Sequence, residues 1–402
     1  MPEPGLSHLK VLELCNLVSG PYCTKLLADL GAEVTKIEPP GIGDEARRRG
    51  PFQEDIPHPE RSGLYLYLNT NKLGITLDVR TSSGRSILRE LIEQTDIFVE
   101  DNPPLVMEEL GLTYEGLKEV NPSLVMTSIT PFGQTGPYRD YKAYELNSFH
   151  GGGEGYLLPM QSPNLDREPV KGGGLVGDCI CGLSASLATL AAAYRMVATG
   201  VGQHVDVSKQ DVLMTMVGLD IAMFANNGIR RNRSRWPVLM SKPMRCRDGH
   251  IMISVLSDRE WGDLVEFMGN PSWAKDERFN TWLERHIYSD AINPHVGEWL
   301  QQYKKEEIFH QLQAEAIAAA PVNTAEEVVK SPQLEHRGFF AEIDHPKAGK
   351  LKYPTASYKF SRTPWRVERA APLLGQHNEF VYCEQLGYNR QDLVRMRESG
   401  VI

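Results

Sequence analysis

Residues 9–38, LKVLELCNLVSGPYCTKLLADLGAEVTKIE, determine the fold of the first part of the chain. Leu9–Leu14 is a short apolar run typical of a strand. Gly20-Pro21 marks a helix start, because proline lacks an N–H that is unpaired at the first helical position anyway. Apolar residues at helical spacing follow over Tyr22–Leu30, and Ala32–Ile37 predicts a second strand. Strand, helix and strand in about thirty residues predict a βαβ unit.

The alternation of strand and helix patterns continues through the next hundred residues. The expected elements are a strand at Gly74–Leu77, a helix at Ser82–Gln94, a strand at Ile97–Val99, a helix at Tyr114–Val120 and a strand at Leu124–Ile129. Sustained alternation of this kind predicts an α/β fold with a doubly wound parallel sheet. A long helix at about Val176–Ala198 is expected to follow.

The middle of the chain has a different texture, which indicates a second domain. We expect residues 1–225 to form the N-terminal part of a large domain and residues 226–243, rich in arginine, to form a linker. Residues 244–325 combine one strand pattern with several helical patterns, and they predict a smaller α+β domain. Residues 326–402 return to short strands and turns.

Composition excludes several classes of function. The 402 residues contain 43 Lys+Arg and 52 Asp+Glu, and this net charge of −9 argues against a nucleic-acid groove. The six cysteines form no CxxC pair, so neither a structural metal nor a disulfide framework is expected. The most apolar run, Cys179–Tyr194, is shorter than a bilayer span, and Met1–Lys10 is too polar for a secretory signal. We therefore expect no membrane association and a cytoplasmic location.

The first strand-to-helix turn raises the question of a nucleotide site. A dinucleotide-binding turn needs the pattern G-x-G-x-x-G, and residues 17–21 read LVSGP, with a single glycine. Glu38, at the end of the second strand, resembles the acidic residue that binds an NAD ribose. An NAD(P) oxidoreductase is therefore a weak alternative. A helix start near Gly20 remains able to receive a phosphate or a polar ligand group.

Four polar residues, Asn69, Thr70, Asn71 and Lys72, precede the expected third strand. Asparagine tolerates left-handed turns, and lysine is a flexible point charge that suits a phosphate. The pattern is more typical of a polar turn with an exposed lysine, but both interpretations stay open at this point.

Asp178, beside Gly177 at the start of the long apolar helix, allows two interpretations. Aspartate is a preferred N-cap residue, which contributes about 1 kcal/mol to stability. The same helix end would keep the carboxylate ionised, and an ionised carboxylate beside glycine loops is able to attack an acyl carbon. Loop N–H groups would then receive the oxyanion.

Several motifs in order give the chain a resemblance to the class III CoA-transferase family, which includes formyl-CoA transferase, carnitine CoA-transferase and the α-methylacyl-CoA racemases. The resemblance starts at VLELCNLVSGPYCTKLLADLGAEVTKIEPPGIGD, residues 11–44. NTNKLGITLDV, FGQTGPY, VGDCICGLSASLATLAAA and APLLGQH follow in the same order, so it runs nearly end to end.

The resemblance implies a fold, an assembly and a site. It implies a Rossmann-like large domain built from both chain ends, with residues 326–402 as a linker and the C-terminal part of that domain. It also implies a smaller middle domain and two chains interlocked as a homodimer. The family's catalytic aspartate falls on Asp178, and the glutamate that assists it falls on Glu145. The family's CoA contacts fall on Val18, Ser19, Asn69, Thr70, Asn71, Lys72, Asp101, Asn102 and Pro103.

The implied activity is the transfer of CoA from an acyl-CoA thioester to a carboxylic acid, through an aspartyl anhydride and an aspartyl-CoA thioester. Acyl-CoA would be a substrate, and no tightly bound cofactor is implied. The alternative within the family is a racemase, whose histidine falls on Tyr144 in this chain. A third interpretation, a non-catalytic CoA-binding protein, fits poorly because Asp178 and Glu145 are both retained.

The chain also departs from the family pattern. Basic residues that hold CoA phosphates in some members fall on Pro39 and Glu109, and Arg47–Arg49 are candidates to replace them. Residues 230–247 contain no counterpart of the glycine-rich flap of formyl-CoA transferase. This absence argues against a formyl or oxalate substrate, and the middle segment looks closer to carnitine CoA-transferase.

Overall fold

The computed structural model describes residues 3–162, 164–234, 239–240 and 242–402. Of the expected linker, residues 235–238 and 241 lie outside the described residues, as do Met1 and Pro2 of the opening segment. The described chain divides into two compact units. The first comprises residues 1–159, 167–233 and 338–402, and the second comprises residues 160–166 and 234–337. The second unit thus extends beyond the expected 244–325 at both ends.

The first unit is built on a parallel sheet of six strands, in the order β3-β2-β1-β4-β5-β6. The strands are β1 (Lys10–Leu14), β2 (Glu33–Glu38), β3 (Leu73–Thr76), β4 (Ile97–Glu100), β5 (Val125–Thr130) and β6 (Gln203–Ser208). The strand order reverses between β1 and β4, which is where α/β sheets of this kind bind ligands. The expected doubly wound parallel sheet is confirmed.

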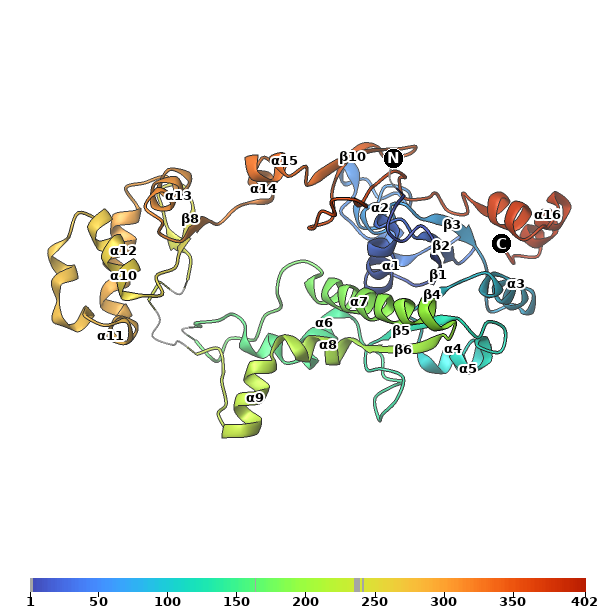
Figure 1. The fold of residues 1–402 in the computed structure, drawn as a ribbon, viewed down its shortest axis with the longest axis horizontal. Helices are drawn as coiled ribbons and strands as arrows, with labels where there is room; N and C mark the ends of the chain where they lie inside the picture. Colours follow the sequence, from blue (N-terminus) through green and yellow to red (C-terminus); the bar gives the residue numbers. More distant parts are fainter. Residues whose placement is uncertain (1–2, 163, 235–238, 241) are drawn as a thin grey trace. The chain divides into compact units, whose positions relative to one another are not determined.

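Helices cover both faces of this sheet (Figure 1). One face packs against α1 (Ser19–Asp29) and α7 (Val176–Thr199), and the other against α3 (Ser82–Glu93), α4 (Pro104–Leu110), α5 (Tyr114–Leu117), η6 (Phe380–Gln385) and α16 (Arg390–Glu398). Alternate residues of β1 point to opposite faces of the sheet: Val11 packs in the core on the α1 side, and Leu12 packs in the core on the α3 side. Each face therefore has its own apolar core.

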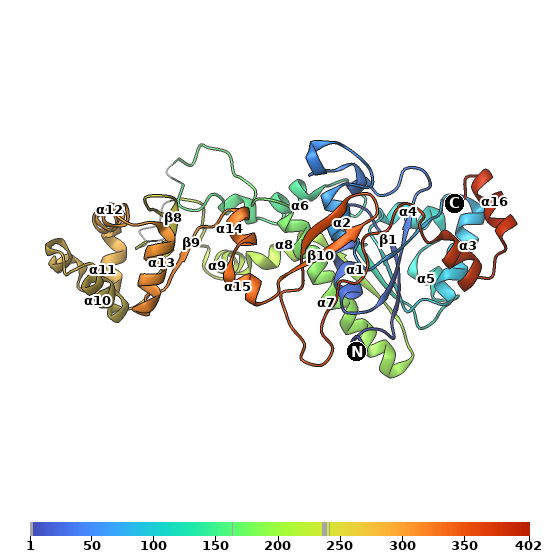
Figure 2. The ribbon, with the colours of Figure 1, turned by 90° about the horizontal axis from the view of Figure 1, so that it is seen from above.

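The C-terminal segment returns to the sheet formed by the N-terminal segment. Asn378 donates a hydrogen bond from Nδ2 to Thr76 Oγ1 at 2.8 Å, and its Oδ1 accepts one from the Thr76 amide at 2.9 Å. Leu393 and Val401 belong to the same core as α3. Figures 1 and 2 both show α16 beside α3. The large unit is thus built from both ends of the chain.

The remaining elements of the first unit surround the carboxyl ends of the strands or form a small satellite core. They are η1 (Glu45–Arg48), η2 (Gln53–Asp55), α2 (Gly63–Leu68), α6 (Glu145–Gly151), η3 (Glu154–Leu157), α8 (Lys209–Met216), α9 (Gly218–Asn227) and the antiparallel pair β10 (Phe340–His345) and β11 (Gly349–Pro354). Helices α8 and α9 meet at Val217.

The second unit has a three-stranded antiparallel sheet and a helical layer around one apolar core. Its elements are β7 (Met244–Arg245), β8 (His250–Ile253), α10 (Asp258–Phe267), η4 (Ser272–Lys275), η5 (Glu277–Phe279), α11 (Trp282–Ile287), α12 (Ser289–Leu300), α13 (Lys305–Ala314), β9 (Ala319–Pro321), α14 (Ala325–Val329) and α15 (Pro332–His336). This composition matches the α+β pattern expected for the middle of the chain.

Helix α7 has the length and mean hydropathy of a membrane span, the only such helix in the described part of the chain. About half of its most apolar stretch is buried, because one face packs on α1 and β5. The opposite face is open: Leu187 is 71% exposed and Tyr194 is 82% exposed. This long helix is thus buried on one face only, which is typical of a helix that covers a sheet.

Candidate active site

A cleft of about 620 Å³ opens beside the carboxyl end of β1 in the first unit. It contains both sequence-predicted catalytic carboxylates. Its lining residues are Leu17, Val18, Arg49, Gly50, Leu64, Tyr144, Glu145, Leu146, Gly174, Leu175 and Asp178. They come from the turn after β1, the end of η1, the start of α2, the start of α6 and the start of α7. The fold therefore gathers segments more than 150 residues apart around one pocket, as the Asp178 contact with Ser19 illustrates.

Asp178 lies in the first turn of α7 and is 7% exposed. The N-cap residue of this helix is Leu175, so the N-cap interpretation of Asp178 is wrong. The carboxylate still lies at the positive end of a helix of 24 residues. Its burial beside a cleft is the arrangement expected of a reactive group rather than of a solvated helix end.

Two side chains hold the same oxygen of Asp178. Ser19 donates a hydrogen bond from Oγ to Oδ1 at 2.8 Å, and Lys209 donates from Nζ to Oδ1 at 3.0 Å. Burial opposes the charge of Lys209, but the Asp178 carboxylate outweighs it and raises the pKa of Lys209 above its usual value. Asp178 thus has a charged partner and a neutral donor, both fixed by secondary structure.

A glycine on α7 brings Ser19 within reach of Asp178. Gly182 lies against α1 so closely that a Cβ there would stand 2.5 Å from the Ser19 carbonyl oxygen. Any side chain at position 182 would therefore separate the two helices. The small residues of α7 thus set the distance from the start of α1 to Asp178.

Glu145, the first residue of α6, also has a lysine partner. Lys171 Nζ lies 3.1 Å from Oε1 and 3.0 Å from Oε2, and it donates a further hydrogen bond to the Gly174 carbonyl. A Cβ on Gly177 would lie 3.1 Å from Glu145 Oε1, so this glycine lets the two carboxylate-bearing helices approach. Each predicted catalytic carboxylate is therefore paired with a lysine beside the same cleft.

Sequence reasoning missed both lysines. Lys209 is the first residue of α8 and follows β6 directly, so it stands at the carboxyl edge of the sheet. That position was the available signal, because polar side chains at this edge surround the ligand in open α/β folds. Lys171 precedes the run Gly172–Gly174, and only its contact with Glu145 distinguishes it from an ordinary loop lysine.

The four residues Asn69, Thr70, Asn71 and Lys72 do not line the cleft. Asn69, Thr70 and Lys72 are completely buried. Lys72 Nζ lies 2.8 Å from Glu13 Oε2 and donates to Asn69 Oδ1 at 2.9 Å. Burial and the neighbouring Lys36 outweigh the attraction of Glu13 and lower the pKa of Lys72 to about 8. The interpretation of Lys72 as an exposed lysine of a polar turn is therefore wrong.

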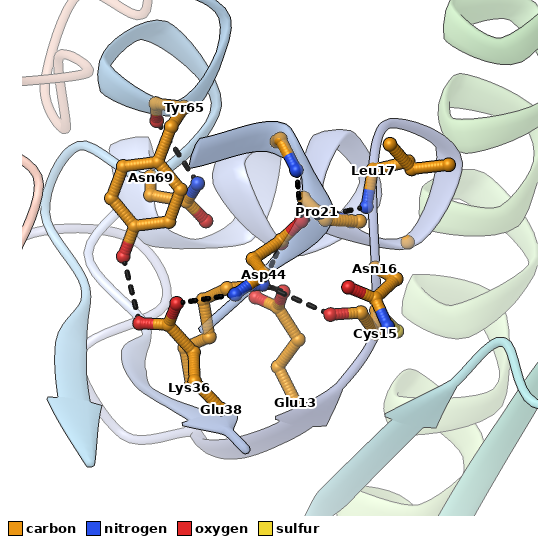
Figure 3. Close-up of polar contacts among 12 residues, drawn as sticks. Glu13, Cys15, Asn16, Leu17, Pro21, Lys36, Glu38, Asp44, Tyr65 and Asn69 are labelled. Atoms are coloured by element: carbon orange, nitrogen blue, oxygen red, sulfur yellow. Dashed lines mark hydrogen bonds and ion pairs between the residues drawn. The ribbon is translucent and has the colours of Figure 1, made fainter. Parts of the chain in front are cut away.

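A buried polar network surrounds this segment (Figure 3). Lys36 lies between two carboxylates, 2.7 Å from Glu13 Oε1 and 2.8 Å from Asp44 Oδ2. Figure 3 also shows Glu38 with Tyr65, whose hydroxyl donates to Glu38 Oε1 at 3.0 Å. The network links β1, β2 and the loop after β2, so it fixes the segments that border the cleft.

The remaining predicted CoA contacts follow β1 and β4. Val18 lines the cleft, whereas the Ser19 hydroxyl is engaged with Asp178. Asp101 accepts the Asn16 amide at 2.9 Å, and Asn102 donates from Nδ2 to the Leu14 carbonyl at 3.1 Å. Pro103 is the N-cap residue of α4. These three residues pack beside the turn after β1, but none of them lines the cleft.

The arginines of residues 47–49 separate into different environments. Arg47 is buried and bonded to Glu38 at 2.6 Å and to Glu60 at 2.6 Å, so it is unable to reach a ligand phosphate. Arg49 is exposed and lines the cleft. Glu38 forms a buried ion pair with Arg47 and is therefore not free to bind a ribose hydroxyl. The NAD interpretation, which depended on Glu38, loses its support.

Fold and site together define an α/β protein with a buried, lysine-paired aspartate in a cleft at the switch point of the sheet. A family model, CoA-transferase family III, matches residues 6–378. The chain therefore belongs to the class III CoA-transferase family, and it is an enzyme that transfers CoA.

The chain is similar over nearly its whole length to proteins that are named CoA-transferases. The succinyl-CoA–D-citramalate CoA-transferase of Chloroflexus aurantiacus is 31% identical over 405 residues, covering 100% of this chain and 99% of the relative. The formyl-CoA:oxalate CoA-transferase of Streptomyces coelicolor is 30% identical, with 100% of both chains covered. The human succinyl-CoA:glutarate CoA-transferase is 27% identical, covering 99% of this chain and 90% of the relative.

Solved structures show the same fold. A CAIB/BAIF family protein from Brucella suis superposes with a TM-score of 0.83 at 30% identity, covering 96% of this chain and 100% of that one. The Rv3272 protein of Mycobacterium tuberculosis gives a TM-score of 0.82 at 25% identity, covering 94% and 99%. The family resemblance drawn from the motifs is confirmed.

Proposed function

We propose that this protein transfers CoA from an acyl-CoA thioester to a small carboxylic acid, with Asp178 as the covalent nucleophile. The observation that carries the proposal is the position of Asp178. Its carboxylate is buried at a cleft, in the first turn of a long helix, with Oδ1 bonded to Ser19 and Lys209. A cationic partner and a helix start keep a carboxylate ionised, which is the state that a nucleophile needs.

The proposed reaction is a double displacement. Asp178 attacks the thioester carbonyl of the donor and releases CoA thiolate, which leaves a mixed anhydride. The thiolate then attacks the aspartyl carbon, releases the donor acid and forms an aspartyl-CoA thioester. The acceptor acid attacks this thioester, the Cγ–S bond breaks to release CoA thiolate, and a second mixed anhydride forms. The thiolate then attacks the acyl carbon of the acceptor, which yields the new acyl-CoA and frees the Asp178 carboxylate. Exclusion of water protects the anhydride, and a buried carboxylate suits that need.

Glu145, the first residue of α6, is proposed to assist Asp178. It lines the same cleft, and Lys171 holds both of its oxygens. A carboxylate at this place is able to orient the acceptor acid or a water through a shared proton. Val18, also in the cleft wall, is proposed to contact CoA. Asn69–Lys72 and Asp101–Pro103 are proposed to contribute through backbone groups, because the described side chains make internal contacts.

The substrate class follows from the relatives. Their names specify succinyl-CoA, glutarate, citramalate, formyl-CoA and oxalate. We propose an acyl-CoA donor and a small carboxylate acceptor for this chain as well. A screen of acyl-CoA donors against carboxylic acids, read by mass spectrometry, would identify the pair.

A racemase is not favoured. Tyr144 occupies the position at which the resemblance places the racemase histidine, and it has no imidazole to move a proton at the α-carbon. The relatives reported above are all named transferases. Exchange of the α-proton of a 2-methylacyl-CoA into deuterated water at turnover rates would contradict the transferase proposal.

We further propose a homodimer in which two chains interlock, in a cytoplasmic location. The support is apolar surface of the first unit that no other described element of that unit covers. Helix α9 has no buried residue, and Leu219 on it is 67% exposed. An apolar groove of about 510 Å³ runs along α9, with Phe224 and Ile221 in its wall. A second copy of the chain would cover this surface.

The test of the nucleophile compares two isosteric variants. Asp178→Asn keeps the shape of the side chain but is unable to attack a thioester, so turnover should be abolished while the protein stays folded. The substitution also removes the carboxylate that pairs with the mostly buried Lys209, so stability should fall by up to about 3 kcal/mol, and circular dichroism should establish that the variant is folded. Incubation of the wild type with acyl-CoA and hydroxylamine should convert Asp178 to a hydroxamate, which peptide mass spectrometry locates.

The matched control is Asp211→Asn, which changes an exposed aspartate in the first turn of α8. It should retain activity and still yield the adduct on Asp178. Near wild-type transfer by Asp178→Asn, or an adduct on another residue, would contradict the proposed function.

A further inference from the structure

The two oxygens of Asp178 have different surroundings. Oδ1 receives both donors, Ser19 Oγ at 2.8 Å and Lys209 Nζ at 3.0 Å. No hydrogen bond from any described residue reaches Oδ2, and this atom is absent from the buried, unpartnered polar atoms of the described chain. Oδ2 therefore keeps its lone pairs free and some access to solvent, beside a cleft that Asp178 helps to line.

We infer that Oδ2 is the attacking oxygen, and that Ser19 and Lys209 form an oxyanion hole at Oδ1 for the steps in which the aspartyl carbon is itself attacked. The inference rests on the proposed function, and it assigns to two side chains a catalytic role that the nucleophile assignment alone leaves open.

The chemistry distinguishes the two oxygens once the anhydride has formed. When Oδ2 attacks the donor carbonyl, negative charge develops on the acyl oxygen of the substrate, and the C–S bond breaks to release CoA thiolate. Oδ1 then becomes the carbonyl oxygen of the aspartyl anhydride. When the thiolate adds to Cγ, the electron pair moves onto Oδ1. Collapse of this oxyanion breaks the Cγ–Oδ2 bond, and the donor acid departs with Oδ2.

The same oxyanion forms once more in the second half of the reaction. The acceptor carboxylate adds to Cγ of the aspartyl-CoA thioester and places charge on Oδ1. Collapse breaks the Cγ–S bond and returns CoA thiolate. Donors at Oδ1 therefore stabilise the oxyanion in two of the four displacement steps, the two in which Cγ is attacked. In both steps the charge forms at the atom to which they are already hydrogen-bonded.

The geometry meets the requirements of an oxyanion hole. Both distances lie within the roughly 2.7–3.1 Å range expected for donors to a developing oxyanion. Ser19 is the first residue of α1, and the contact of Gly182 with the Ser19 carbonyl sets its distance from α7. Lys209 begins α8 directly after β6, so its backbone is fixed by the sheet. Donors held by secondary structure cost no reorganisation during the reaction.

Charge at Lys209 is maintained at neutral pH. Its side chain is 17% exposed, and its pKa lies above that of an ordinary lysine because of Asp178. An ammonium in a poorly hydrated site stabilises an oxyanion more strongly than it would in water. A protonated lysine is also unable to attack the anhydride, which keeps the acyl group on Asp178.

A purely structural ion pair would behave differently from an oxyanion hole. Loss of a structural contact would slow all steps together or lower stability. Loss of a donor at Oδ1 should slow attack on Cγ much more than formation of the first anhydride. The enzyme would then accumulate the acyl adduct at the expense of the CoA adduct, and the exposed anhydride would lose its acyl group to water.

The experiment uses Lys209→Met, Lys209→Arg and Ser19→Ala in the full-length protein. Each is mixed with acyl-CoA alone, quenched in acid and digested, and the Asp178 peptide is analysed by mass spectrometry for acyl and CoA adducts. We expect transfer to fall about 10²-fold for each removed donor. We also expect the ratio of acyl adduct to CoA adduct, and of hydrolysis to transfer, to rise at least tenfold by the same reasoning. In Lys209→Arg, which keeps a charged donor, both ratios should lie between those of Lys209→Met and the wild type.

Lys305→Met is the matched control, because it removes another lysine–carboxylate contact, with Glu327 at 2.7 Å in the second unit. It should leave both ratios unchanged, whatever its effect on stability. Ser19→Ala removes a single hydroxyl, so it tests the inference even if Lys209→Met fails to fold. Unchanged adduct ratios in folded variants would overturn the inference while leaving the proposed function standing. Absence of any Asp178 adduct in the wild type would overturn both.

Discussion

The Asp44 carboxylate accepts a hydrogen bond from the backbone amide of Leu17, with 3.0 Å between Oδ1 and the nitrogen. Leu17 has a φ of 62°, in the left-handed region that leucine rarely adopts. The contact stabilises this conformation, and the same Oδ1 accepts the Ala46 amide at 2.7 Å. Asp44 thus joins the turn after β1 to the start of η1, two segments that border the cleft.

We predict that Asp44→Ala lowers both stability and activity. It removes one of the two carboxylates that flank the buried Lys36, and it leaves the Leu17 amide without its acceptor. Breaking a buried ion pair of this kind costs about 3 kcal/mol or more. Thermal unfolding should show the loss, and kcat/KM should fall because the cleft wall shifts.

The control for this variant is Glu45→Ala, which removes the exposed neighbouring carboxylate. Its stability should stay within about 0.5 kcal/mol of the wild type. Equal unfolding temperatures for Asp44→Ala and Glu45→Ala would show that the contact with Leu17 is unimportant.

Glu100 gives the fold a specific pH dependence. Burial raises the pKa of this carboxyl from 4.5 to about 7, although hydrogen bonds from Ser128 and Asn102 oppose the shift. Between these two values the folded state binds more protons than the unfolded state, so stability should fall as the pH rises from about 5 to 7. A difference of about 2.5 pKa units corresponds to about 3 kcal/mol.

Glu100→Gln removes this titration. The variant should be more stable than the wild type at pH 8, and the difference between them should shrink toward pH 5. Denaturant midpoints measured across this range would reveal it. A parallel pH dependence in the two proteins would contradict the assignment.

Arg49 is the arginine of residues 47–49 that is exposed in the cleft wall, whereas Arg47 is bonded to Glu38 and Glu60. We predict that Arg49→Gln raises the KM for acyl-CoA about tenfold, because a charge-assisted hydrogen bond to an anion contributes about 1.5 kcal/mol or more. Arg48→Gln is the control, since Arg48 is exposed but does not line the cleft. A rise confined to the KM of the acceptor acid would contradict a contact with CoA.

The sequence predicted the sheet because β1, α1 and β2 carry local patterns that agree with their final environment. It also predicted Asp178 and Glu145 as catalytic residues through the family resemblance, and the structure places both beside one cleft. The pairing of Lys209 with Asp178 was not predictable from the sequence, because the two residues lie 31 positions apart and the packing of α7 against α8 brings them together.

Lys72 shows a different limit. Its polar neighbours predicted exposure, yet tertiary packing buries it beside Glu13. A signal was present in the strand: Glu13 interrupts the apolar run Leu9–Leu14, and an acidic residue in a buried strand requires a cationic partner. The pattern indicates that a partner exists, but it does not say which of many lysines supplies it.

The proposed interlocked dimer predicts that the protein does not dissociate on dilution. Chains that thread through each other separate only by unfolding, so sedimentation and light scattering should find a dimer even at nanomolar concentration. Leu187, on the open apolar face of α7, is 71% exposed, and we propose that the second chain covers this face, so that a charge placed there would be buried in the dimer. Leu187→Glu should therefore sharply lower the yield of folded protein, because a buried unpaired charge costs several kcal/mol.

Val394→Glu provides the comparison, since Val394 is 52% exposed on α16, away from α7 and α9. It should assemble as the wild type does. An active wild-type monomer at nanomolar concentration, or equal yields of the two variants, would contradict the interlocked assembly.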